Sequence, residues 1–218
     1  MKTQNWILTI LIMVSLDMVM SACTAIRKPL SSPPTAFVAV YESEVGIKDR
    51  HQQKIHLQQT FESDGNGHMR WSNNQVPPRQ WQFRNYKNQS MYAVNDPQKI
   101  FYLLPAPLGG VFLIDEPSAV AAASPSLKCN IRLVGTEIMD GHTCKHYIGS
   151  LQHPLEDERT PFDVWYSDEL HCAIKTQGLA RDAHLISYKQ VPRSLIEIPK
   201  NYRAVDVYTF NKASGDPK

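Results

Sequence analysis

Three potential metal ligands alternate along one short stretch of the chain. His142, Cys144 and His146 are separated by one residue each, so on a β-strand their side chains point to one face. Imidazole and thiolate groups suit Zn²⁺ or Cu²⁺, and strand pairing would bring the carboxylate of Glu137 beside Cys144. Established metal sites show tighter motifs. We therefore expect half-exposed strand residues here, with no bound metal and no cofactor.

The other cysteines indicate a structural role. Cys129, Cys144 and Cys172 can form at most one internal disulfide in an oxidising compartment. A meander of strands would bring Cys144 close to Cys172, which favours a bridge between these two. A bridge between Cys129 and Cys172, or three buried thiols, are the alternatives.

Catalytic motifs are absent from the sequence. It contains no Gly-x-Ser-x-Gly elbow, no His-Glu-x-x-His pair and no phosphate-binding loop. Neighbouring acids such as Asp115 and Glu116 lie in an apparent loop and are interpreted as solvated charge. The 23 Lys and Arg residues and 21 Asp and Glu residues give a net charge of +2, with no basic stripe for nucleic acid. We expect a protein that is not an enzyme and binds no nucleic acid.

A lipidation motif lies near the N-terminus. The sequence Met20-Ser21-Ala22-Cys23 ends an apolar stretch and has the form of a lipobox. This pattern predicts a lipoprotein signal peptide over residues 1–22, with Cys23 as the first residue of the mature chain. Cys23 would carry a diacylglycerol on its thiol and a palmitate-type acyl chain on its amine, and two or more chains hold a protein on a bilayer.

The main alternative to lipidation is a transmembrane anchor that is not cleaved. Its apolar run up to Asp17 is short for a bilayer span, which needs about 20 residues. Thr24 follows the cysteine, whereas an Asp at that position retains lipoproteins in the inner membrane of bacteria with two membranes. We expect an anchor in the inner leaflet of the outer membrane, facing the periplasm.

The mature chain is expected to form one domain. Removing the signal peptide leaves about 196 residues, enough for a single hydrophobic core. Residues 23–35 are rich in Pro and Ser and predict a flexible tether. The domain would span residues 36–212, followed by a tail over 213–218.

Strand-like runs fill most of this domain. They are rich in Val, Ile, Tyr, Phe and Thr and recur at intervals of roughly 8 to 12 residues between turn residues. Asp140-Gly141 is a strong hairpin signal, and its register places Glu137 opposite Cys144 and Leu133 opposite Ile148. The predicted strands are 37–45, 54–61, 68–72, 81–86, 90–94, 100–104, 129–139, 142–150, 162–166, 172–176 and 184–191.

Five segments of the chain occur in a characteristic order. They are 67–71, 96–105, 135–147, 164–168 and 196–202. In this order they resemble the bacterial lipoprotein-carrier (LolA/LolB-like) superfamily, and more closely an uncharacterised lipid-anchored branch of it. The resemblance implies a mainly β fold: a strongly curved antiparallel half-barrel with a short helical segment over its concave face and an apolar cavity for acyl chains. Transport activity does not follow from the fold.

The segment 105–126 interrupts the strands and is the expected cover of the concave face. Its second half is rich in Ala and predicts a short helix that begins near Pro117. An apolar face of this size must be covered by a helix, a lipid or a partner. The segment is either a movable lid over a lipid cavity or a fixed plug that completes the core. The lid residues would be Leu108, Val111, Phe112, Leu113 and Ile114.

Two functions fit these features. The first is a membrane-anchored, non-enzymatic lipoprotein whose half-barrel binds a hydrophobic ligand or a lipidated partner. The second is a structural or assembly protein that docks another envelope protein through a barrel face or an edge strand.

Overall fold

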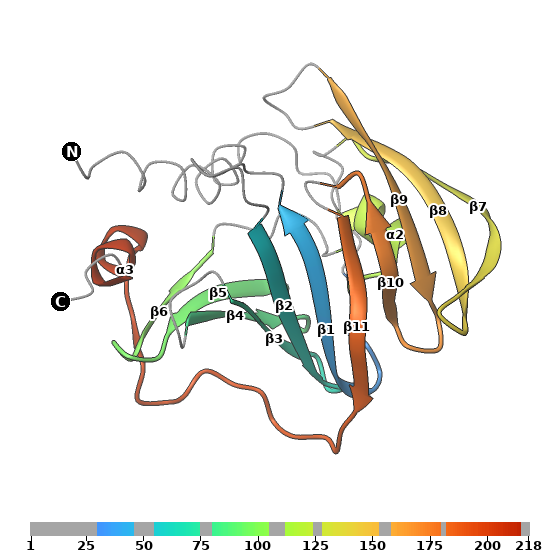
Figure 1. Ribbon diagram of the computed structural model, residues 1–218. Coiled ribbons are helices and arrows are strands. Elements are labelled where there is room, and N and C mark those ends of the chain that lie inside the picture. The colour runs from blue at the N-terminus through green and yellow to red at the C-terminus, as the bar shows by residue number, and fades with distance from the viewer. Residues whose placement is uncertain are drawn as a thin grey trace.

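One curved sheet dominates the computed structural model, which describes residues 30–45, 55–74, 80–104, 112–123, 128–152, 158–179 and 182–214. Twelve strands in these ranges follow the order β12-β6-β5-β4-β3-β2-β1-β11-β10-β9-β8-β7. Figure 1 shows a strongly bent sheet that does not close on itself. The strands are β1 (Ala36–Val45), β2 (Ile55–Asp64), β3 (His68–Asn73), β4 (Gln80–Asn85), β5 (Ser90–Asn95), β6 (Ile100–Leu103), β7 (Asn130–Met139), β8 (His142–Gln152), β9 (Arg159–Ser167), β10 (Cys172–Gln177), β11 (Asp182–Gln190) and β12 (Arg203–Ala204).

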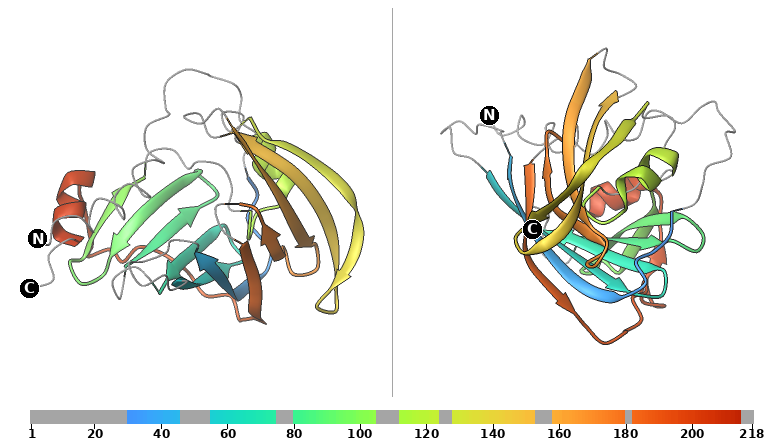
Figure 2. Two further views of the ribbon diagram at one scale, coloured as in Figure 1. Left: turned by 45° about the horizontal axis from the view of Figure 1, so that its top comes forward. Right: turned by 90° about the vertical axis from the view of Figure 1, so that its right-hand side faces the viewer.

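Two antiparallel meanders make up this sheet. Strands β1 to β6 form the first and β7 to β11 the second, and the pairing of β1 with β11 joins them. Among the described strands, only the short β12 pairs in parallel, with β6. Two short helices, α2 (Pro117–Ala123) and α3 (Val207–Ser214), lie on the inner side of the curve (Figure 2). The predicted fold class, a mainly β, strongly curved antiparallel half-barrel with a short helix over its concave face, is confirmed.

A bulge changes the register of the Asp-Gly hairpin. Glu137 lies opposite Cys144, as predicted, but Leu133 lies opposite Tyr147 and not opposite Ile148. The pairing shifts between Leu133 and Gly135, because Val134 is an extra residue on β7. A turn motif fixes the register only up to the first irregularity of the ladder.

The turn between β2 and β3 is held by one buried carboxylate. Asp64 accepts hydrogen bonds from the backbone N–H groups of Asn66 (2.7 Å) and His68 (3.0 Å), and from Nδ1 of His68 (2.8 Å). Gly65 has a φ of +67°, and a Cβ there would lie 2.8 Å from the backbone nitrogen of Ala36. Burial opposes the charged form of Asp64, but these hydrogen bonds outweigh it and lower the pKa of Asp64.

We expect Asp64→Asn to lower the free energy of unfolding by about 1–3 kcal/mol at pH 7, because Asn lacks the charge that strengthens these bonds. A depressed folded-state pKa contributes stability above the unfolded-state pKa, and this contribution is lost as the pH falls through the folded-state pKa. The difference between parent and variant should therefore shrink below about pH 4. Urea denaturation at a series of pH values measures it, and a difference independent of pH would contradict the assignment.

Both ends of the described chain pack onto the sheet. Leu30 is buried in the main core, and its backbone N–H and C=O groups bond to the side chain of Gln89. Leu30 falls within the predicted tether over 23–35, whose other residues up to 29 lie outside the described part of the chain. At the other end, α3 extends to Ser214, two residues beyond the predicted domain boundary at 212.

The C-terminal segment covers both faces of strands β4 to β6. Ile196, Ile198 and Tyr202 pack on one face, against Trp81 and its buried neighbours. On the other face, Phe210 of α3 contacts Tyr102 with ring centroids 4.7 Å apart. In the described part of the chain, no helix is long and apolar enough to cross a membrane.

Candidate functional site

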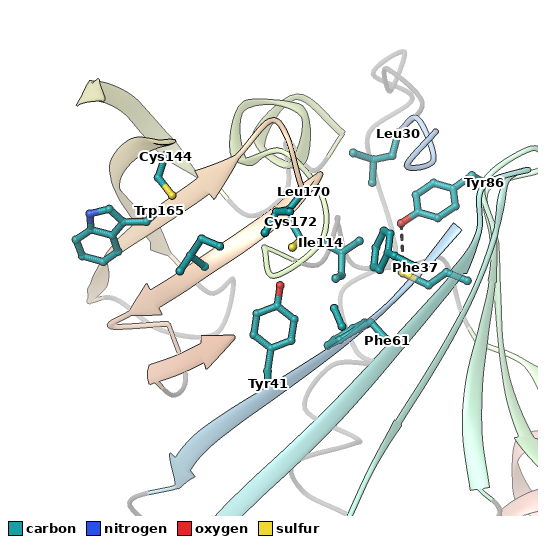
Figure 3. Packing of buried hydrophobic residues seen from close by; sticks show 13 residues of the cluster. Leu30, Phe37, Tyr41, Phe61, Tyr86, Ile114, Cys144, Trp165, Leu170 and Cys172 are labelled. Atoms are coloured by element: carbon teal, nitrogen blue, oxygen red, sulfur yellow. Dashed lines mark hydrogen bonds between the residues drawn. The ribbon is translucent and has the colours of Figure 1, made fainter. Parts of the chain in front are cut away.

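The concave face of the first meander is closed at one end by residues 112–123, which we call the cover. The carbonyl oxygen of Leu113 accepts a hydrogen bond from the Tyr41 hydroxyl (2.9 Å) and one from the backbone N–H of Ala173 (2.8 Å). Ile114 is 1% exposed and packs in the same cluster as Tyr41, Phe61 and Cys172 (Figure 3). The cover therefore fills the space between β1 and β10.

A buried ion pair ties the cover to β4. Arg84 Nη1 lies 2.9 Å from Asp115 Oδ2, with the two side chains 5% and 1% exposed. Tyr86 donates to the other carboxylate oxygen at 2.9 Å. Burial, and then the carboxylate of Asp115, raise the pKa of Tyr86, so its hydroxyl stays a donor. The interpretation of Asp115 as solvated charge is wrong, because its partners come from strands distant in sequence.

The next acid, Glu116, fixes the start of α2. Its carboxylate accepts hydrogen bonds from the backbone N–H of Ala119 (3.0 Å) and from the hydroxyls of Ser118 and Tyr147. Burial alone would raise the pKa of Glu116, but these three bonds lower it. The interpretation of Glu116 as solvated charge is also wrong, because its carboxylate is engaged in these hydrogen bonds. Its position just before a Pro-led helix was the signal of a capping role.

Three of the five predicted lid residues lie in the described part of the chain. Leu108 and Val111 lie outside the described residues. Phe112 packs against Phe162, with ring centroids 5.0 Å apart. The carbonyl of Leu113 accepts its two hydrogen bonds, and Ile114 is packed in the main core. Phe112, Leu113 and Ile114 are thus packed against their neighbours, and the choice between a movable lid and a fixed plug stays a prediction.

We therefore expect Phe112→Asp to lower the free energy of unfolding by about 2–4 kcal/mol, because a half-buried aromatic contact is replaced by a poorly solvated charge. Leu103→Asp is the control, since Leu103 is 59% exposed on β6. Thermal melting measures both variants. Unchanged melting of Phe112→Asp together with weaker ligand retention would instead support a movable lid.

Beside the cover, one row of side chains crosses the concave face. Cross-strand pairs place Phe61 opposite Trp71, Trp71 opposite Gln82, Gln82 opposite Ala93, and Ala93 opposite Tyr102. The row starts in the main core, where Phe61 stacks on Trp71, and ends under α3. Its three middle residues, Trp71, Gln82 and Ala93, are only half-buried. We call these three the central row.

Two polar atoms of the central row are buried and unpartnered among the described residues. They are Nε1 of Trp71 and Oε1 of Gln82, from side chains that lie directly opposite each other. One is a donor and the other an acceptor. Buried polar groups normally have a partner, so the pair is suited to a neutral group that both accepts and donates a hydrogen bond. The sequence showed no signal of this row, because it depends on the pairing of three strands.

The predicted disulfide between Cys144 and Cys172 is not formed. All three described cysteines are free, and β9 lies between the strands of Cys144 and Cys172. Two strand spacings amount to about 9.5 Å, beyond the reach of a disulfide. The predicted meander is present, but it places β9 between the strands of the two cysteines, so they are two strand spacings apart and not one. Burial raises the pKa of Cys172 to about 12 and that of Cys129 to about 11, so both are protonated thiols at neutral pH.

The metal candidates are engaged in other contacts. His146 lies between two carboxylates, with Nδ1 2.8 Å from Glu137 Oε1 and Nε2 2.8 Å from Asp163 Oδ1. Cys144 is buried, and His142 faces Glu169 at 3.7 Å. Both ring nitrogens of His146 face carboxylate oxygens at hydrogen-bond distance, so neither nitrogen is free to bind a metal. Within the described ranges, no group of three or more His, Cys, Asp and Glu residues is arranged to hold a metal ion.

No family model and no curated protein matches the sequence. Solved structures do show similar sheets. An uncharacterized conserved protein from Thermus thermophilus has a TM-score of 0.47 at 10% identity, over 79% of this chain and 90% of that chain. A LolA superfamily protein from Nitrosomonas europaea has a TM-score of 0.33 at 11% identity, over 77% and 90%. A putative outer membrane lipoprotein-sorting protein domain from Vibrio parahaemolyticus has a TM-score of 0.35 at 8% identity, over 82% and 89%.

The protein has LolA-like structural neighbours. The likeness concerns the fold, and every one of these TM-scores is below 0.5. Cys23, the predicted lipidation site, lies outside the described residues.

Proposed function

We propose that the protein is a lipid-anchored protein of the cell envelope that binds one amphiphilic molecule on its concave face and catalyses no reaction. The central row carries this proposal. It offers apolar surface from Trp71 and Ala93, together with an unpartnered donor and acceptor at Trp71 Nε1 and Gln82 Oε1. An acyl chain would lie along the row, and a neutral head group such as a hydroxyl would bond to both atoms.

The apolar character of the surroundings supports an acyl chain. Phe61 and Tyr102, at the two ends of the row, are buried and belong to apolar clusters. Burial of apolar surface contributes roughly 25 cal/mol per Å², so a chain lying over the half-buried Trp71 and Ala93 between them gains most of its affinity from contact area. The ligand is either a free lipid or the acyl chains of a lipidated partner protein, which share this chemistry.

The lipobox supports the cellular location. Lipidation of Cys23 would hold the domain at a membrane surface, and Thr24 in place of Asp favours the outer membrane, with the domain facing the periplasm. The concave face would then lie within reach of lipids and of other lipoproteins.

Quenching of Trp71 fluorescence tests ligand binding directly. We expect a monoacylglycerol brominated along its chain to quench the fluorescence of the purified protein, because bromine quenches an indole only at contact distance. Trp71→Phe should remove most of this quenching. Trp165→Phe should leave it, because Trp165 stacks on His146 outside the row. No quenching of the parent protein would reject the ligand, and quenching that survives Trp71→Phe would reject the site.

A second function, docking of another envelope protein, is favoured by one observation. Strand β7 is an edge of the sheet, and eight of its ten residues are exposed. An unpaired edge strand can accept a strand from a partner.

A further inference from the structure

The two edges of the sheet differ in how well they are protected. Edge strands present unpaired backbone groups, and proteins protect them by shortness, Lys, Pro or bulges. At one edge β12 has only two residues, whereas β7 at the other has ten, contains neither Lys nor Pro, and has a single bulge at Val134. Leu133, Val134 and Ile138 of β7 are 51%, 50% and 80% exposed. Figure 1 shows β7 on the outer side of β8, with no other described strand on its far side.

The bulge at Val134 gives β7 an internal symmetry. Two residues of a strand share a face of the sheet when the residues opposite them in the partner strand are two, four or six positions apart. Ile131 and Ile138 lie opposite Gly149 and Thr143 of β8, so they share a face. They are seven residues apart in the sequence, so in a strand without the bulge they would lie on opposite faces.

The same rule applies to the other pairs around the bulge. Arg132 and Glu137 share the second face, since their partners in β8 are Ile148 and Cys144. Leu133 and Thr136 share the first face, with partners Tyr147 and Lys145. All these pairs are centred between Val134 and Gly135.

We propose that β7 pairs antiparallel with β7 of a second copy of this chain, about a two-fold axis between Val134 and Gly135. A two-fold axis perpendicular to a continuous sheet requires opposed residues to share a face, and this register meets the requirement for residues 130–133 opposite 136–139, on either side of the bulge. Ile131 then lies opposite Ile138 of the second copy, and Arg132 opposite Glu137, each twice. The proposal does not depend on ligand binding at the concave face.

Charge supports this register. Arg132 is exposed and has no ion pair or hydrogen bond with another described residue. Glu137 is half-exposed, and hydrogen bonds from Trp165 and then His146 lower the pKa of Glu137 and keep it charged. A carboxylate can accept more than two hydrogen bonds, so Glu137 can also receive Arg132 of the second copy. A register that set Glu137 opposite itself would bring like charges together.

Cysteine cross-linking between two differently tagged copies tests the register. In a Cys129→Ser background, copies with Leu133→Cys and copies with Thr136→Cys are co-expressed and oxidised in the membrane. We expect a disulfide-linked heterodimer when both are present and none when either is alone, because each position faces the other and not itself. Ile186→Cys on β11, 48% exposed, replaces Leu133→Cys in the control and should give no product.

Arg132→Glu tests the interface without testing the fold. It should weaken self-association at least about tenfold in sedimentation velocity of the detergent-solubilised protein, because like charges then face each other twice. Its melting temperature should match the parent, since Arg132 has no partner within the described chain. A parent that is monomeric with no heterodimer product overturns the proposal. So does equal cross-linking by the Ile186→Cys control, or cross-linking of β7 only to a protein of different mass.

Discussion

Arg84→Met is expected to lower the free energy of unfolding by about 3–5 kcal/mol, because it leaves the carboxylate of Asp115 buried without its cation. The two side chains are 5% and 1% exposed, so water cannot replace the lost partner. The Tyr86 hydroxyl still donates one hydrogen bond, which does not neutralise the charge. The cover would lose its attachment to β4. Urea denaturation at pH 7 measures the effect.

Two matched variants separate this ion pair from general effects of removing an arginine. Arg84→Met combined with Asp115→Leu should recover most of the lost stability, because replacing both partners with apolar groups is often close to neutral. Arg70→Met should cost less than about 1 kcal/mol, because the Arg70 and Glu62 side chains are 44% and 28% exposed. A loss of stability in Arg84→Met no larger than in Arg70→Met would show that the cover is not held by Asp115.

Cys23→Ser is expected to abolish processing, so that the protein accumulates as a precursor that keeps residues 1–22. The lipidation reaction needs a thiol, and cleavage of the signal peptide follows lipidation. Metabolic labelling with radioactive palmitate should label the parent and leave the variant unlabelled. Intact mass measurement of both proteins gives the same answer independently.

The alternative anchor makes a different prediction for the same variant. A transmembrane segment that is not cleaved would leave parent and Cys23→Ser protein with equal processing and equal membrane association. Mature soluble protein beginning at another residue in the variant would show an ordinary signal peptide. Either result would contradict lipidation at Cys23.

Local patterns predicted the strands well, because each is short, rich in β-branched and aromatic residues, and bounded by turn residues. The expected strand at 68–72 is β3 (His68–Asn73), and the expected helix near Pro117 is α2. The contacts between distant strands were not predictable in this way. Asp115 finds Arg84 only after β4 and the cover are brought together.

The C-terminal part was missed for a related reason. The predictions contain neither β12 nor α3, since the segment Val207–Ser214 is short and only Phe210 in it is buried. Its helix is stabilised by packing on Tyr102 rather than by propensity. The bulge at Val134 likewise depends on how β7 and β8 pair. Gly135 beside it was a sequence signal that was missed, since an isolated glycine inside a strand often marks a bulge.

Native mass spectrometry of the gently purified parent protein tests the central claim most directly. Covalent acyl chains on Cys23 stay attached when the protein is denatured, whereas a lipid bound on the central row is released. We predict an additional lipid mass in the native spectrum that disappears on denaturation, and that is reduced in Trp71→Asp relative to the exposed control Leu103→Asp. A parent protein that carries only its covalent acyl chains under native conditions would contradict ligand binding on the concave face.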